Sequence, residues 1–222
     1  MRHFTVELEE LNQKLLEMGG FVETAIRRSV QALVEQNQEI AEQVIHDEPR
    51  INTREMEIDG LVTRLLALRQ PVARDLRFLT SALKINTDLE RMGDLAVNIA
   101  ERSLSLMDHP LGQSMTHIPA MAELVQSMLL KTLTAFVDGD EQLARSVLPL
   151  DDEVDALRDA VYGRLLGIMQ DDPTRVPPAI DLIFVARNLE RIGDHVTNIA
   201  EDVVFLVKGV DVRHHAERVG NL

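Results

Sequence analysis

The sequence predicts an all-α protein made of two tandem antiparallel three-helix bundles, with six long helices in all. Three observations lead to this prediction. Apolar residues recur every three or four positions along extended stretches, which is the period of a helix with one buried face. Only 3% of the residues are aromatic and none is tryptophan, so aliphatic side chains must fill the core, as suits a helix bundle. Finally, a polar string near residue 90 returns near residue 190.

Three helices are predicted in the first half. The first begins near Phe4, and its apolar period continues to about Ile45. Pro49 is expected to mark the start of the second helix, because proline is favoured in a first turn. That helix ends at "RQP" (69–71), and the third helix follows to about Met107.

The same scheme repeats after a linker rich in turn-forming residues, "DHPLGQSMTHIP" (108–119). The fourth helix starts near Met121 and ends at "DGD" (138–140). A fifth helix is predicted from about 141 to 169, and a sixth from about 178 to 208.

The two repeats define the expected domains. The first covers 1–110, and the second covers 111–222 and ends in a short polar tail. A small change of offset between the copies, such as a loop of different length would cause, is typical of an internal duplication.

Composition excludes several classes of protein. A net charge of −14 argues against nucleic-acid binding and against direct adsorption to anionic lipid. Without cysteine there is no disulfide, thiolate metal site or cysteine nucleophile. Residues 1–10 do not form a signal peptide, and the apolar runs are too short to span a bilayer. We therefore expect a cytoplasmic protein.

The repeated string is too polar to be a by-product of helix periodicity. Between 87–101 and 187–201, nine of fifteen positions are identical, and five of those nine are polar or charged. Because each helical residue turns by about 100°, the shared acids and amides fall on one face, opposite the apolar stripe. These face residues are Glu90, Asp94, Asn98 and Glu101 in the first copy, and Glu190, Asp194, Asn198 and Glu201 in the second.

Carboxylates four residues apart on a helix can bridge a hard cation, which prefers oxygen ligands. The preceding helix of each half offers a further pair, in "EPRIN" (48–52) and "DDEVD" (151–155), related by an offset of 103. A solvated helix face remains the simpler alternative. The candidate metal ligands are Glu48, Asn52, Glu90, Asp94, Asn98, Glu101, Asp151, Asp155, Glu190, Asp194, Asn198 and Glu201.

Three other motif residues have different expected roles. The repeated Arg91 and Arg191 either pair with the acids or bind an anion or a protein partner, and the sequence leaves this choice open. His195 has Leu95 as its counterpart, so we expect a surface residue rather than a ligand.

Long segments carry a family resemblance: "LALRQPVARDLRFLTSALKINTDLERMGD", "FVARNLERIGDHVTNIAEDVVFLVKG" and "DVRH". With them the chain resembles the PhoU family of bacterial phosphate-signalling proteins over nearly its full length. The resemblance implies a PhoU-like, spectrin-repeat-like pair of three-helix bundles in a cytosolic, often dimeric protein. It also implies a non-enzymatic negative regulator of phosphate uptake and of the phosphate-starvation response. Its implied partners are the phosphate ABC transporter, through the ATPase subunit, and the phosphate sensor histidine kinase, so the resemblance implies that the protein reaches the membrane only through protein partners.

Some members of that family bind metal clusters, iron among them, at surface E(D)xxxD motifs. These map here to Glu90 with Asp94 and to Glu190 with Asp194, facing the pairs on the preceding helices. Asn52 departs from the all-acid pattern and leaves the first site one charge poorer. The sequence does not choose among iron, manganese, magnesium and zinc, and no organic cofactor is expected.

Two alternatives to a regulator remain. A di-iron oxidase or metal store would use Glu-x-x-His pairs in a bundle core, but no histidine here follows a glutamate by three residues. A purely structural bundle would use its acidic faces only for solubility. The sequence has no Gly-rich phosphate loop and no G-x-S-x-G motif, so we expect no catalysis.

Overall fold

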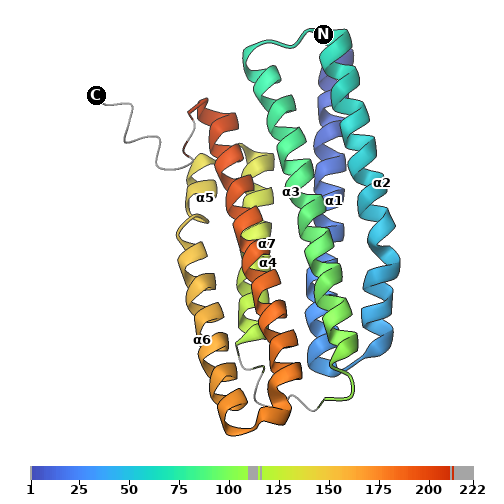
Figure 1. The fold of residues 1–222 in the computed structure, drawn as a ribbon. Helices are drawn as coiled ribbons and strands as arrows, with labels where there is room; N and C mark the ends of the chain where they lie inside the picture. Colours follow the sequence, from blue (N-terminus) through green and yellow to red (C-terminus); the bar gives the residue numbers. More distant parts are fainter. Residues whose placement is uncertain (1, 110–114, 116, 211, 213–222) are drawn as a thin grey trace, which may run out of the picture.

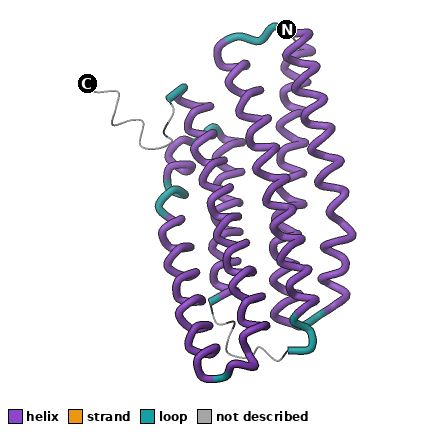
Figure 2. Tube along the Cα trace, in the orientation of Figure 1, coloured by secondary structure: helices purple, strands orange, loops and turns teal. Residues whose placement is uncertain are grey.

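The computed structural model describes residues 2–109, 115, 117–210 and 212, and over this part of the chain it contains helices and no strand (Figures 1 and 2). The all-α prediction is confirmed. Half of the predicted linker, residues 110–114 and 116, and most of the polar C-terminal tail lie outside the described residues. The helices are α1 (Arg2–Glu35), α2 (Gln38–Arg69), α3 (Ala73–Ser105), α4 (Ile118–Asp138), α5 (Glu141–Arg145), α6 (Leu150–Asp171), the 3₁₀ helix η2 (Pro173–Arg175) and α7 (Val176–Lys208).

Helices α1–α3 form one bundle, and α4–α7 form a second bundle beside it (Figure 1). The bundles meet through α3 against α7, which run antiparallel, and through α1 against α4 behind them. Helices α2 and α6 lie on the two outer sides. The motif-bearing helices α3 and α7 are thus the central pair of the molecule.

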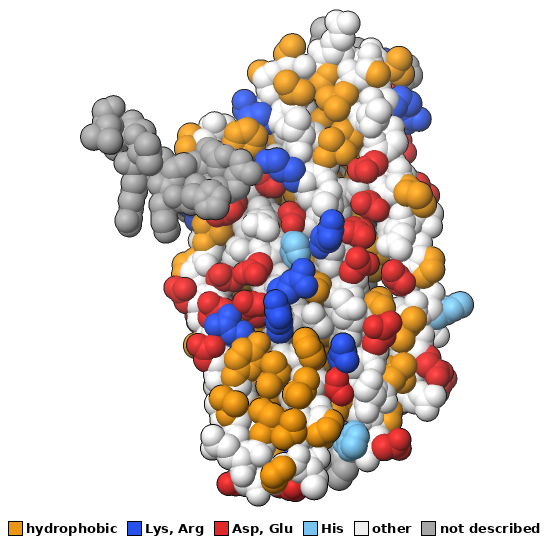
Figure 3. Space-filling model, in the orientation of Figure 1, with side chains coloured by type: hydrophobic (Ala, Val, Ile, Leu, Met, Phe, Trp, Pro, Cys, Tyr) orange, Lys and Arg blue, Asp and Glu red, His pale blue; other side chains and the backbone are white. Residues whose placement is uncertain are grey.

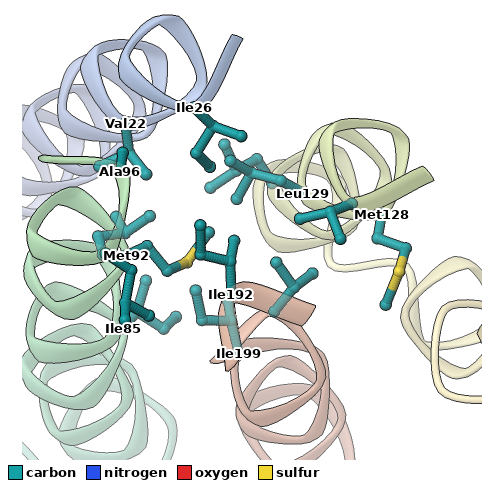
Figure 4. Packing of buried hydrophobic residues seen from close by; sticks show 14 of the residues in the cluster. Val22, Ile26, Ile85, Met92, Ala96, Met128, Leu129, Ile192 and Ile199 are labelled. Carbon is teal, nitrogen blue, oxygen red and sulfur yellow. The ribbon is translucent and has the colours of Figure 1, made fainter. Parts of the chain in front are cut away.

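One hydrophobic core serves both halves. Buried apolar side chains from all six long helices form a single cluster, part of which Figure 4 shows. Met92 of α3 lies next to Ile192 of α7, Leu129 of α4 points toward the same region, and Met128 lies on the other side of α4. Because this core crosses from one half to the other, each bundle covers apolar surface of its neighbour. The predicted division at 110 lies between α3 and α4.

The first predicted helix boundary is wrong. Helix α1 ends at Glu35, about ten residues before the predicted end, and Gln36 reverses the chain with a φ of 48°. Asn37 then caps α2 by accepting a hydrogen bond of 3.2 Å from the Ile40 N–H. Pro49, expected to begin a helix, lies inside α2. The apolar period does not reveal the turn, because buried residues continue on the far side of it.

The predicted fifth helix is also divided. Helix α5 ends at Arg145, and α6 begins at Leu150 with Pro149 at its N-cap. Proline has no N–H and fixes φ, so it suits the start of α6 rather than the interior of one continuous helix. Helices α3, α4 and α7 begin and end within a few residues of the predicted positions.

Helix α4 is unusual in composition. Among the described helices it alone is long and apolar enough to cross a membrane, judged by length and composition. Half of its most apolar window is buried inside the protein, where α4 packs on α1, α6 and α7. The other half of that window is partly buried or exposed.

The contact between the two halves follows their internal duplication. Lys84 Nζ lies 2.8 Å from Asp202 Oδ1 at one end of the α3–α7 pair. At the other end Arg102 lies 3.1 Å from Asp181 and stacks over the Phe184 ring at 4.9 Å. Positions 84 and 102 correspond to 184 and 202 at the repeat offset of 100. The halves are therefore related by an approximate two-fold axis between α3 and α7.

Candidate functional site

The repeated motif occupies the middle of α3 and α7, and its glycines face the preceding helix of each half, closely at Gly93 and at ordinary contact distance at Gly193. A Cβ on Gly93 would lie 2.9 Å from Ile51 Cδ1 of α2. A Cβ on Gly193 would lie 3.5 Å from Val154 Cγ1 of α6. Ile51 and Val154 are equivalent at the offset of 103, so each half places its acidic motif against the same part of the preceding helix.

In the second half the structure brings four predicted residues together, here named the α6–α7 acidic cluster: Asp151, Asp155, Glu190 and Asp194. Burial raises the pKa of Asp151 to about 6, and the charges of Asp194 and Asp155 add to the effect. Burial also raises the pKa of Asp194, followed by the charges of Glu190 and Asp155. These carboxylates repel one another in a partly dehydrated site.

Arg158 supplies a positive charge within this cluster. Its Nη1 donates hydrogen bonds to Asp155 Oδ1 at 2.7 Å and to Glu190 Oε1 at 2.9 Å. Its Nη2 donates to Asp159 at 2.9 Å, and only 21% of the side chain is exposed. The guanidinium therefore stands between the two helices where a bound cation would otherwise neutralise the acids.

In the first half the corresponding group, the α2–α3 acidic cluster, consists of Glu55, Glu90 and Asp94. Burial raises the pKa of Glu90, and the charges of Asp94 and Glu55 add to it. Burial raises the pKa of Glu55 too, followed by the charges of Asp59 and Asp94. Glu55 is equivalent to Arg158 at the offset of 103, so the two clusters carry opposite charges at the same position.

The predicted α2 pair, Glu48 and Asn52, is joined by a hydrogen bond within its own helix. Asn52 Nδ2 donates to Glu48 Oε1 at 3.4 Å, and Asn52 Oδ1 is buried without a hydrogen-bond partner. Glu48 lines a cavity of about 280 Å³ between α1 and α2. The α2 carboxylate whose charge acts on Glu90 is that of Glu55, which the sequence analysis missed. The sequence feature that could have identified Glu55 is its spacing: it follows Asn52 by three residues, just as Arg158 follows Asp155 by three residues.

The remaining motif positions lie at the edge of these clusters. Asn98, Glu101 and Asn198 are exposed, and Glu201 is half-buried. Arg91 is exposed and lies 3.7 Å from Glu90, which lowers the pKa of that carboxyl against the effect of burial. Its counterpart Arg191 is also exposed.

His195 has a partner that the sequence analysis did not foresee. Its Nδ1 lies 2.8 Å from Asp88 Oδ1 of the other half, and the two side chains are 20% and 17% exposed. The side chain is therefore more buried than expected for a surface histidine, and it joins the two halves of the molecule. His195 is present in only one of the two motifs. Because it lies on the side of α7 that faces α3, its partner Asp88 belongs to the other repeat rather than to its own motif.

Figure 3 shows the resulting charge pattern on this face. Acidic side chains gather over α2 and α3 on one side and over α6 on the other, with Lys and Arg side chains between them. Within the described part of the chain, no three His, Asp or Glu side chains are placed to hold one metal ion. As the side chains lie, the clusters are charged surfaces rather than assembled coordination sites.

Comparison with known families gives a direct match to this architecture. The family model described as PhoU domain matches twice, over residues 15–103 and 118–203. The two matches cover the two bundles, including both copies of the repeated motif.

Several curated proteins are similar over nearly the whole chain. A phosphate-specific transport system accessory protein PhoU homolog of Pseudomonas aeruginosa is 39% identical, covering 96% of this chain and 88% of that protein. Proteins of the same name are 38% identical in Caulobacter vibrioides, with 96% and 93% covered, and in Clostridium acetobutylicum, with 94% and 96% covered.

Two solved structures have the same fold. The crystal structure of PhoU from Pseudomonas aeruginosa superposes with a TM-score of 0.90 at 38% identity, over 93% of this chain and 100% of that one. The phosphate transport system regulatory protein PhoU from Streptococcus pneumoniae gives 0.88 at 33% identity, over 94% and 99%. These likenesses confirm the two-bundle architecture and the resemblance stated from the sequence.

Proposed function

The chain belongs to the PhoU domain family, and on that basis we propose that it is a regulatory accessory protein of a phosphate-specific transport system. The observation that carries the proposal is the double match of the family model, joined to relatives of that name over nearly the full chain. In this proposal the protein is a negative regulator of phosphate uptake and of the phosphate-starvation response. It acts in the cytoplasm as a homodimer, by contact and without catalysis.

The proposed partners are the ATPase subunit of the phosphate ABC transporter and the phosphate sensor histidine kinase. Arg91 and Arg191 are the proposed contact residues, because both are exposed on the central face formed by α3 and α7. Exposed arginines between acidic groups offer bidentate hydrogen bonds to carboxylates of a partner and set its orientation through charge.

A complementation experiment tests this function. A bacterial strain without its own PhoU protein would receive the natural chain, the Arg91→Ala/Arg191→Ala variant, or the control Arg64→Ala, which changes an exposed arginine of α2. Phosphate uptake and a phosphate-starvation reporter would be measured in phosphate-rich medium. We expect the natural chain and the control to repress the reporter and the double variant to leave it active. Failure of the natural chain to repress contradicts the regulatory role, and full repression by the double variant contradicts the arginine contact.

We further propose that a divalent cation or iron binds at the α2–α3 acidic cluster. Its donors, Glu55, Glu90 and Asp94, are carboxylates; burial, and then their mutual repulsion, raise the pKa values of Glu55 and Glu90, and a hard cation relieves such repulsion. Side chains must rotate toward a common point for this to occur. The α6–α7 acidic cluster fits a cation poorly, because Arg158 already binds two of its carboxylates.

Metal content distinguishes the two clusters. The protein would be incubated anaerobically with iron, manganese, magnesium and zinc, desalted, and analysed by mass spectrometry. We expect Glu90→Gln/Asp94→Asn to lose retained metal and the matched Glu190→Gln/Asp194→Asn to keep it. Equal retention by natural protein and both variants would show that the clusters are not the binding site, and loss only in the second variant would reverse the assignment.

A further inference from the structure

A groove runs along α1 and α4, the helices that Figure 1 shows behind α3 and α7. It consists of a larger cavity of about 610 Å³ and a smaller one of about 200 Å³. Both are lined by Gln126, which joins them end to end. The lining extends over residues 16–35 of α1 and 119–138 of α4, and a 20-residue helical segment is about 30 Å long. The groove is therefore as long as a partner helix of about five turns.

The groove is itself duplicated. All nine residues that line the smaller cavity are equivalent, at the offset of 103, to residues that line the larger one. Arg27 corresponds to Leu130, for example, and Glu123 corresponds to Gly20. This offset also relates the α2 and α6 segments, so the groove follows the same approximate two-fold symmetry as the fold.

Sequence differences between the copies make the two ends of the groove unlike. At the larger end, Gly19 and Gly20 stand where the smaller end has Ala122 and Glu123. A Cβ on Gly19 would meet Leu133 at 2.5 Å, whereas a Cβ on Gly20 would meet nothing within 4 Å. Gly19 thus permits α1 and α4 to pack, and Gly20 leaves open space above them.

Exposed apolar side chains flank this space. Leu130 is 66% exposed and Val137 is 43% exposed, on the outward face of the helix that is apolar enough to span a membrane. The free-energy cost of exposing an apolar face to water grows with its area, so a partner that covers this face is stabilised by removing that area from water.

The charges at the groove indicate what covers it. Four acids line its two cavities, while Arg27 is the single base among the lining residues and lies 3.7 Å from Glu23. An acidic rim disfavours anionic lipid and nucleic acid. It favours a helix with an apolar stripe and flanking Lys or Arg, which is a recurrent mode of helix recognition in a groove. The four acids are Glu23, Glu35, Glu123 and Asp138.

We propose that the α1–α4 groove is a docking site for a basic amphipathic helix of a protein partner. The apolar stripe of that helix packs on Leu130 and over Gly20, and its basic residues pair with the acids of the rim. The groove involves neither acidic cluster and neither proposed contact arginine. The proposal goes beyond the role in phosphate regulation, and its test uses no phosphate readout.

The probe is a synthetic, fluorescein-labelled 20-residue peptide with leucines spaced three and four residues apart and lysines on both flanks. Its binding to the full chain would be followed by fluorescence anisotropy. Gly20→Trp fills the open space, and Gly60→Trp is the matched control, because a Cβ on Gly60 of α2 also meets nothing within 4 Å. Circular dichroism and thermal unfolding check that both variants fold. We expect Gly20→Trp to weaken binding at least tenfold and Gly60→Trp to change it less than twofold.

A second peptide, with the same residues reordered to remove the apolar stripe, separates groove binding from general attraction to an acidic protein. We expect it to bind at least tenfold more weakly than the amphipathic peptide. Equal binding of the two peptides, equal effects of the two Trp variants, or no binding at all overturns the proposal. Sedimentation velocity adds one more outcome: if Gly20→Trp abolishes a dimer while the peptide does not bind, the occupant is a second copy and the proposal is wrong.

Discussion

Replacing Asp151 with Asn tests whether the α6–α7 acidic cluster holds unfavourable charge in the folded protein. The pKa of Asp151 is about 6 in the fold against 3.8 for an ordinary aspartate. Between about pH 4 and pH 6 the folded chain therefore binds more protons than the unfolded chain, and stability falls as the pH rises through this window. Above it, the full cost of ionising Asp151 is present.

The size of the effect follows from the shift. A shift of this size corresponds to about 3 kcal/mol at roughly 1.4 kcal/mol per pH unit. Asp151 is only partly buried, so solvent screening reduces this figure, and we expect about 1 kcal/mol. At pH 7.5, Asp151→Asn should then raise the free energy of unfolding by about 1 kcal/mol and Tm by roughly 2–4 °C. At pH 4 the gain should disappear, because the natural aspartate is then protonated in the fold.

Thermal and urea unfolding at the two pH values, in buffer with a chelator, measure this difference. Asp152→Asn is the matched control: both residues lie in the first turn of α6, so both variants lose the same attraction to the helix N-terminus. Asp152 is exposed, and its replacement should change stability by less than about 0.5 kcal/mol. An equal effect of the two variants at pH 7.5, or a gain for Asp151→Asn that persists at pH 4, would refute the reasoning.

Three further predictions concern packing and charge. Gly20→Ala should raise the free energy of unfolding by roughly 0.5–1 kcal/mol, because alanine is the better helix former. Gly19→Ala should lower the free energy of unfolding by about 1–3 kcal/mol, because its Cβ would overpack against Leu133. A urea-unfolding change of the same sign for both variants contradicts this prediction. Arg158→Ala should lower the free energy of unfolding by about 1 kcal/mol at pH 7.5, because Asp155 and Glu190 lose the ion pairs of 2.7 and 2.9 Å that Arg158 makes with them. An unchanged stability in thermal unfolding argues against that role. Lys84→Met should lower the free energy of unfolding by about 1–3 kcal/mol, because Asp202 is 5% exposed and loses an ion pair. A double-mutant cycle with Asp202→Asn should show coupling between the two residues, and additive effects of the two substitutions would exclude it.

The sequence predicted the number and direction of the long helices because their apolar residues keep a helical period along each buried face. It failed where a break leaves that period intact. Gln36 adopts a positive φ that non-glycine residues rarely take, and no propensity reveals it. Pro49 and Pro149 show a second limit: the first lies inside α2 and the second precedes α6. Proline is compatible with a first turn and, at some cost, with an interior, so packing decides between them.

Within the site, spacing along one helix predicted which residues share a face, and the structure brings together Asp151, Asp155, Glu190 and Asp194. Spacing could not identify contacts made across helices by long side chains. Arg158 reaches the acid of α7 because α6 lies beside it, and His195 meets Asp88 because the two halves pack through α3 and α7. Such contacts depend on the relative rotation of helices, which a single sequence does not specify.

The shared core of the two bundles has a consequence for how the repeats can evolve. If the repeats were separate chains, their association would weaken on dilution. Each repeat would also have to pack against whichever repeat it encountered, of its own kind or of the other kind. Covalent linkage replaces that encounter with an intramolecular one at high effective concentration. The ratio of the two repeats is then fixed at one to one in every molecule. Each half meets only its own partner, so one copy can carry His195, which pairs with Asp88 of the other half, while that other half carries Leu95 at the equivalent position, without producing mismatched pairs.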